Sequence, residues 1–230
     1  MQSIFQNRAD AGRALAALVS RSVVDTNPLI LALPRGGVPV GFEVAHALQA
    51  ELDIFLVRKL GLPGQEELAI GAIASGGVRI LNESLIRELR LSHRLIDRVT
   101  AQAEDELQRR EELYRRGRAA LAVRDRTIIL VDDGLATGAT MKAASAALQA
   151  QGPRRIIVAV PVAAEEIFEE FRTKATGIVC LYTPKQFTSV GVWYEDFSQT
   201  TDEEVERLLD RADAEKQRRA GLHVDYPQQE

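Results

Sequence analysis

Cysteine is almost absent from this sequence, which has Cys180 alone among 230 residues. One cysteine supports neither a disulfide framework nor a cysteine-based zinc site. Long apolar runs are missing too, because no stretch approaches the roughly 20 apolar residues that cross a membrane as a helix. The first residues also lack the apolar core of a secretory signal. We therefore expect a cytoplasmic protein that does not cross a membrane.

A strong excess of either charge is also missing. Lysine and arginine total 29 and aspartate and glutamate total 33, which gives a formal net charge of −4. Proteins dedicated to nucleic acids usually carry a basic excess or a basic patch, so we expect no nucleic-acid partner. The G-x-G-x-x-G and G-x-x-x-x-G-K-[ST] nucleotide motifs do not occur. What remains is the composition of an ordinary globular domain, with 46% hydrophobic and 27% charged residues.

The most informative segment, residues 127–140, reads TIILVDDGLATGAT. It begins with an apolar run rich in β-branched residues, which is typical of a strand buried on both faces of a parallel sheet. Asp132 and Asp133 follow where this strand should leave the sheet, and a helical pattern covers residues 141–150. The connecting loop consists of Gly134, Leu135, Ala136, Thr137, Gly138, Ala139 and Thr140.

This order of strand, acidic pair, loop and helix suits a phosphorylated sugar. Main-chain N–H groups of the loop and the N-terminus of the helix can hold a phosphate dianion. Thr137 and Thr140 can add hydroxyl donors, and small residues let the phosphate approach the backbone. The two carboxylates can accept hydrogen bonds from vicinal hydroxyls. The alternative is a plain turn with a solvated acidic pair, but adjacent carboxylates at a buried strand end need a partner.

ILVDDGLATGAT resembles the phosphoribosyl pyrophosphate (PRPP) signature of the type I phosphoribosyltransferases. The resemblance implies that Asp132 and Asp133 are catalytic and face the ribose hydroxyls. It also implies that the loop from Gly134 to Thr140 binds the 5-phosphate. One position departs from the pattern: the 6-oxopurine enzymes of the family have an aspartate near the base where this chain has Ala136. A hypoxanthine–guanine activity is therefore in doubt.

A second strand–loop–helix pattern comes earlier in the chain. A short apolar run over residues 29–33 leads into Pro34-Arg35-Gly36-Gly37, and a helical pattern covers about residues 39–50. The main-chain amides of such a loop and the Arg35 guanidinium suit a diphosphate, although glycine turns are equally common without a ligand. The resemblance implies that Arg35, Gly36 and Gly37 hold the pyrophosphate opposite the 5-phosphate loop.

Residues 53–57 read as the next strand, which would put Arg58 and Lys59 at its end. Strand C-termini of a doubly wound sheet share one rim, where ligands bind. We predict that both cations bind pyrophosphate, with a solvated pair as the alternative. VRKLGLPG resembles the start of a mobile loop in the adenine-type enzymes, and closing such a loop excludes water. Glu67, or Glu66 beside it, is the candidate for proton transfer, with an exposed acidic loop as the alternative.

The middle of the chain predicts a hairpin and a long helix. Residues 69–81 surround a Ser-Gly-Gly turn, as in a β-hairpin. A helical stretch capped by Asn82 or Ser84 runs to about Arg116, with one apolar stripe among mixed charges. Packing of this stripe on a second copy of the chain is a hypothesis, which a monomeric mass in light scattering would rule out.

Strands and a helix alternate again over residues 156–181, as in a parallel α/β sheet. Residues 183–200 then gather four aromatic side chains, which can seal the sheet edge or stack on a planar base. FTSVGVWYEDF resembles the base-side segment of the purine enzymes. This resemblance implies that Phe187 and Trp193 border the acceptor and that Asp196 approaches Mg²⁺.

Together these patterns predict an α/β fold: a parallel, doubly wound type I phosphoribosyltransferase sheet with a small hood region and a long inserted helix. We expect one domain over residues 1–230, with a core at about 27–183, a helical insertion at about 84–118 and a hood and tail at 184–230. A C-terminal helix should begin at Asp202.

The predicted activity is Mg²⁺-dependent transfer of ribose-5-phosphate from PRPP to a nitrogenous acceptor, with a nucleobase foremost, and release of pyrophosphate. That would be a step of nucleotide metabolism. A non-catalytic PRPP or nucleotide sensor of the same fold is the alternative. No set of residues in the sequence specifies the acceptor.

Overall fold

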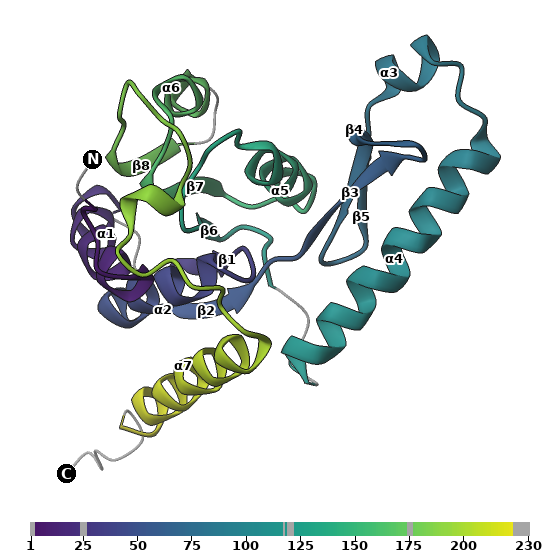
Figure 1. The fold of residues 1–230 in the computed structure, drawn as a ribbon. Coiled ribbons are helices and arrows are strands. Elements are labelled where there is room, and N and C mark those ends of the chain that lie inside the picture. Colours follow the sequence, from purple (N-terminus) through teal and green to yellow (C-terminus); the bar gives the residue numbers. More distant parts are fainter. Residues whose placement is uncertain (1–2, 24–26, 117, 119–121, 174–176, 223–230) are drawn as a thin grey trace.

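A five-stranded parallel sheet in the order β2-β1-β6-β7-β8 forms the centre of the molecule (Figure 1). The computed structural model describes residues 3–23, 27–116, 118, 122–173 and 177–222, without the side chains of residues 66, 67 and 222. The strands of the sheet are β1 (Leu29–Ala32), β2 (Glu51–Ile54), β6 (Thr127–Val131), β7 (Arg155–Val162) and β8 (Gly177–Tyr182).

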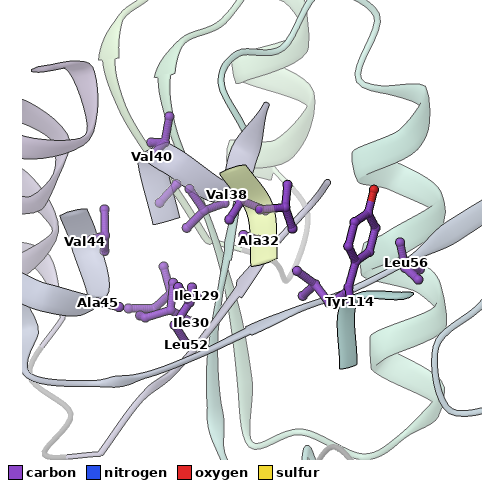
Figure 2. Packing of buried hydrophobic residues seen from close by; sticks show 14 of the residues in the cluster. Ile30, Ala32, Val38, Val40, Val44, Ala45, Leu52, Leu56, Tyr114 and Ile129 are labelled. Carbon is purple, nitrogen blue, oxygen red and sulfur yellow. The ribbon is translucent and has the colours of Figure 1, made fainter. Parts of the chain in front are cut away.

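Helices cover both faces of this sheet because its strands are apolar on both sides. Along β6, Ile129 and Val131 belong to one buried cluster, whereas Ile128 and Leu130 belong to the other. The first cluster also contains residues of α1 (Arg8–Ser22), α2 (Gly37–Leu48) and α7 (Asp202–Leu222). The second contains residues of α5 (Ala139–Ala150) and α6 (Glu165–Thr173). Figure 2 shows part of the first cluster, with Ile129 beside Ile30. The predicted doubly wound α/β fold is confirmed.

After β2 the chain leaves the central sheet and builds a second one, which is antiparallel and has the order β3-β4-β5. Its strands are β3 (Val57–Leu62), β4 (Gln65–Ala74) and β5 (Val78–Leu81), so the predicted hairpin over residues 69–81 is confirmed. The predicted strand over residues 53–57 is wrong, because β2 ends at Ile54 and β3 starts at Val57. Phe55 and Leu56 between them are buried, and the apolar run therefore hides the break.

Two helices follow where one was predicted. α3 (Glu83–Glu88) and α4 (His93–Arg115) are separated at residues 89–92, where Arg90 has a φ of 50°. Asn82 caps α3 as predicted, since its side chain accepts a hydrogen bond from Leu85 N, and Ser92 caps α4 in the same way through Leu95 N. We call residues 57–115 the arm, which follows β2 in the chain and extends to one side of the central sheet, next to α5 (Figure 1).

The N-terminal segment lies along the segment that follows β8. Phe5 and Tyr194 form a parallel bridge, and the N–H groups of Ile4 and Phe5 both donate to the Trp193 carbonyl, at 3.1 and 3.0 Å. A short 3-10 turn, Gly191–Trp193, precedes this pairing, and α7 begins at Asp202 as predicted. Within the described ranges no helix is both long enough and apolar enough to cross a membrane.

Candidate functional site

The two predicted anion-binding loops lie side by side at the carboxyl ends of β1 and β6. These strands are neighbours, and the strand order runs outward from them in opposite directions, to β2 on one side and to β7 on the other. A doubly wound sheet binds ligands in the crevice at such a switch point. Leu33 N donates to the Val131 carbonyl at 2.9 Å and joins the two strand ends. The fold therefore brings the acidic pair and the Pro34–Gly37 loop together.

Two glycines allow this close approach. A Cβ on Gly36 would lie 2.0 Å from Asp133 Oδ2. A Cβ on Gly37 would lie 2.8 Å from the Val131 carbonyl oxygen and 3.0 Å from the Cα of Asp132. The φ of Gly36 is −59°, which any residue can adopt, so space rather than backbone conformation demands glycine there.

Burial and mutual repulsion dominate the electrostatics of the acidic pair. Asp132 is half-buried, and the Asp133 carboxylate is 15% exposed. Burial raises the pKa of Asp132 well above its usual value, and the neighbouring charge of Asp133 raises it further. The pKa of Asp133 is also raised by burial, although the hydrogen bond and charge of Arg8 offset part of the rise. Such perturbed carboxylates in a crevice are a mark of functional sites.

Arg8 and Tyr194 hold the acidic pair from outside the two loops. Arg8 Nε donates to Asp133 Oδ2 at 2.8 Å, and the Tyr194 hydroxyl donates to the main-chain carbonyl of Asp133 at 2.6 Å. Burial, and then the charge of Asp133, raises the pKa of Tyr194, so it stays a neutral donor. Sequence reasoning missed both contacts. Arg8 lies in the first turn of an amphipathic helix and carries no local signal, whereas Tyr194 was noticed only as one of several aromatics.

The predicted 5-phosphate loop leaves the crevice and enters α5. Gly134 and Gly138 are buried, whereas Ala136, Thr137, Ala139 and Thr140 are exposed to an incoming group. Gly138 caps α5 with a φ of 67°, and a Cβ there would lie 2.8 Å from the side chain of Ile167. The exposed loop and the first turn of α5 therefore present main-chain N–H groups and two hydroxyls, as an anion requires.

The predicted pyrophosphate cations reach this loop from the arm. Arg58 and Lys59 lie within β3, so their expected position at the end of a central strand is wrong. They line a cleft of about 630 Å³ between β3 and α4 that extends to Thr140. Arg58 Nη2 pairs with Glu106 Oε2 of α4 at 2.5 Å. A small cavity of about 40 Å³ also joins Pro34, Arg58 and Thr140.

Arg35 is paired with the start of the last helix. Its Nη1 lies 3.5 Å from Asp202 Oδ1, and the Tyr114 hydroxyl of α4 donates to the same oxygen. Burial and this hydrogen bond raise the pKa of Tyr114. The Pro34–Arg35 peptide is cis. The arginine that was predicted to bind pyrophosphate is thus paired with the Asp202 carboxylate.

The remaining predicted site residues are Trp193, Phe187, Asp196 and Glu67. Trp193 is 6% exposed and packs in a cluster with Phe5 and Tyr194, and the Phe187 ring stacks 6.4 Å from it. This packing favours the alternative in which the aromatics seal the sheet edge. The exposed Asp196 carboxylate accepts a hydrogen bond from Ser198 N at 2.9 Å. The Glu67 backbone belongs to β4, and its side chain lies outside the described parts.

A metal ion would find few protein ligands here. In the ranges that the structure covers, no group of three or more His, Cys, Asp or Glu side chains could hold one. Asp132 and Asp133 offer carboxylate oxygens beside the loops that would receive phosphates. Mg²⁺ commonly binds through one or two carboxylates, substrate phosphates and water. The residues present therefore fit a Mg²⁺ that arrives with a diphosphate.

Comparison with known proteins agrees with this geometry. Residues 2–192 match the family described as phosphoribosyl transferase domain. A Mycobacterium tuberculosis protein, provisionally named a phosphoribosyl transferase, is 47% identical over 209 residues, which are 91% of this chain and 47% of that protein. The chain thus spans about half the length of the curated relatives it matches. The crystal structure of TT1426 from Thermus thermophilus is 42% identical, with a TM-score of 0.81 over 91% of this chain and 98% of that one. The chain belongs to the phosphoribosyl transferase domain family.

Proposed function

We propose that this protein transfers the ribose-5-phosphate of PRPP to a nitrogenous acceptor of the nucleobase class and releases pyrophosphate. The observation that carries the proposal is the pair Asp132 and Asp133, which lies at the switch point between two glycine loops. Both carboxylates have raised pKa values, and one is held by a largely buried arginine, whose side chain is 12% exposed. A structural turn has no need of two partly buried carboxylates that repel each other.

The substrate groups divide among the loops by charge. The hydroxyls of the ribose suit the acidic pair, which as carboxylates only accept hydrogen bonds. The 5-phosphate suits the exposed amides and hydroxyls of the loop that ends at Thr140. Pyrophosphate suits the amide of Gly36 together with the cations Arg35, Arg58 and Lys59, whereas the Gly37 amide donates to the Leu33 carbonyl. The small cavity that joins Pro34, Arg58 and Thr140 supports a site in which both phosphate regions are close together.

The chemistry is a displacement at C1 of the ribose. A nitrogen lone pair forms the new C1–N bond while the C1–O bond to pyrophosphate breaks and its electrons leave with the diphosphate. Positive charge develops on the ribose, and Asp132 and Asp133 stabilise it electrostatically in a site of low dielectric. When Mg²⁺ is bound, it supplies neutralisation of the leaving diphosphate. The proton of the acceptor nitrogen leaves to a base or to water, and Glu67 is the candidate base.

For the acceptor we propose a chemical class, the nucleobases, rather than a single compound. The half-buried Phe187 ring offers a stacking face at the border of the hood segment, and the buried Trp193 supports it from behind. Ala136 stands where the 6-oxopurine enzymes of the family have an aspartate, which disfavours a 6-oxopurine acceptor. A purine or pyrimidine without that requirement is therefore the first group to test.

Sustained turnover tests this proposal against a PRPP sensor. The protein is mixed with PRPP, Mg²⁺ and one nucleobase at a time, and released pyrophosphate is measured for the wild type and for Asp133→Asn. The proposal predicts many turnovers with at least one base and a loss of about a hundredfold or more in the variant. Saturable PRPP binding without turnover for any base would favour the sensor.

A further inference from the structure

Arg8 joins three segments that are far apart in the sequence. Its Nε donates to Asp133 Oδ2 at 2.8 Å, and its Nη1 donates to the Ser198 carbonyl at 2.6 Å. Its Cζ lies 3.9 Å above the centre of the Phe197 ring. The guanidinium therefore connects α1, the end of β6 and the segment before α7. The side chain is 12% exposed, which is low for an arginine.

Helix formation does not explain an arginine at this position. Arg8 is the first residue of α1, directly after the cap Asn7. A cation at the N-terminus of a helix is disfavoured by the helix dipole, and burying the guanidinium costs solvation energy. Arg8 thus has a position that is unfavourable for its charge unless a buried anion compensates it. The anion present is Asp133.

The contact with Arg8 engages one oxygen of the Asp133 carboxylate. Arg8 donates to Oδ2 from one side, and the main chain of Gly36 crowds the same oxygen, to which a Cβ would come within 2.0 Å. Among the described residues, Arg8 donates the one side-chain hydrogen bond to this carboxylate. An ionised carboxylate accepts at both oxygens.

We propose that Arg8 is a positioning residue: it holds the Asp133 carboxylate in the orientation in which Oδ1, the oxygen that Arg8 does not contact, accepts a hydrogen bond from a ribose hydroxyl of PRPP. This inference rests on the proposed function. Arg8 itself does not touch the sugar and acts through Asp133. It is also the connection by which the N-terminal segment and residues 197–198 contribute to the site.

The test is a calorimetric titration of PRPP with Mg²⁺ at neutral pH. Arg8→Met removes the charge and keeps the length of the side chain, and Arg8→Lys keeps the charge without the planar fork. Arg13→Met is the matched control, because Arg13 lies on the same helix in an exposed ion pair with Asp10. Thermal unfolding of each variant reports on the fold.

We expect Arg8→Met to bind PRPP about tenfold more weakly at neutral pH, since a hydrogen-bonded charge is lost. Arg8→Lys should recover part of the affinity because it keeps a charged donor beside Asp133, and Arg13→Met should match the wild type. If Arg8→Met does not fold, Arg8→Lys still tests the inference through its intermediate affinity.

Two outcomes would overturn the inference alone. Arg8→Met could bind PRPP as tightly as the wild type does, or both Arg8 variants could bind PRPP equally weakly, which is the result of a purely structural role. Failure of the wild type to bind PRPP is a separate result. It would overturn the proposed function, and this inference with it.

Discussion

Gly36 and Asp133 are in such close contact that the glycine has no room for a single carbon atom. A Cβ on Gly36 would lie 2.0 Å from Asp133 Oδ2 and 2.8 Å from its carboxyl carbon. The same Cβ would lie 3.1 Å from Arg8 Nε. The loop after β1, the end of β6 and the first turn of α1 therefore depend on one another at a single point.

Gly36→Ala should damage both stability and binding. The added methyl group must push Asp133 away from Arg8, which we expect to cost about 1–3 kcal/mol in the free energy of unfolding and to weaken PRPP binding about tenfold or more. Urea unfolding and PRPP titration measure the two effects. Gly221→Ala is the control, because a Cβ there meets no atom within 4 Å. Wild-type binding by Gly36→Ala would show that the contact has no role in the site.

Asp132→Asn should stabilise the fold while it weakens PRPP binding. Burial and the charge of Asp133 raise the pKa of Asp132 in the folded chain, so the folded state binds a proton more tightly than the unfolded state. The contribution of Asp132 to stability therefore falls as pH rises from the unfolded pKa, about 4, through the raised folded pKa. Asparagine keeps the oxygen that accepts from Asp133 N.

At pH 7 we expect the free energy of unfolding of Asp132→Asn to exceed that of the wild type by about 0.5–2 kcal/mol. The difference should shrink as the pH is lowered toward 4. Urea unfolding of both proteins across this range measures it. A variant that is less stable than the wild type at pH 7 would contradict the raised pKa of Asp132. A difference in the free energy of unfolding that does not change with pH would contradict it as well.

Asp202→Asn should strengthen the binding of inorganic pyrophosphate with Mg²⁺. Asp202 competes for Arg35, and asparagine removes the competing charge while its oxygen still accepts from the Tyr114 hydroxyl. The ion pair is partly exposed, so the gain should be modest, about two- to fivefold. Asp210→Asn, which alters an exposed carboxylate of the same helix, is the control. Unchanged or weaker binding by Asp202→Asn would argue against Arg35 as a pyrophosphate ligand.

Replacing Trp193 should mainly lower the stability of the fold, whereas replacing Phe187 should mainly weaken acceptor binding. Trp193 is buried among Phe5, Val162 and Tyr194, so Trp193→Ala should cost about 3 kcal/mol or more in the free energy of unfolding. Phe187 is half-buried, and Phe187→Ala should cost less while it raises KM for the acceptor. Thermal unfolding and acceptor kinetics measure the pair. A Trp193→Ala variant with wild-type stability and an altered KM would move the acceptor site to Trp193.

Local patterns in the sequence were enough to predict the central sheet and its two glycine loops. β6 was predicted to its last residue, because an apolar β-branched run that ends in two aspartates has few other structures open to it. Asn82 and Asp202 likewise mark helix starts through their own short-range hydrogen bonding or charge.

Contacts between distant segments could not be predicted in this way. The run from Leu52 to Val57 is apolar almost throughout, although it crosses from one sheet to another, so the destination of Arg58 was wrong. Arg8 meets Asp133 because α1 packs against α2, β7 and β8, which follow it at a distance in the sequence. No periodicity within α1 distinguishes this arginine from its exposed neighbour Arg13.

Titration of PRPP with Mg²⁺ into the wild type and Asp133→Asn asks whether the crevice between the two glycine loops binds PRPP. We expect saturable binding of one PRPP per chain by the wild type. We expect binding about tenfold weaker or worse for the variant, which loses the charge that faces the ribose and its pairing with Arg8. No binding by well-folded wild type, or equal binding by both proteins, would contradict the assignment of this crevice as a PRPP site.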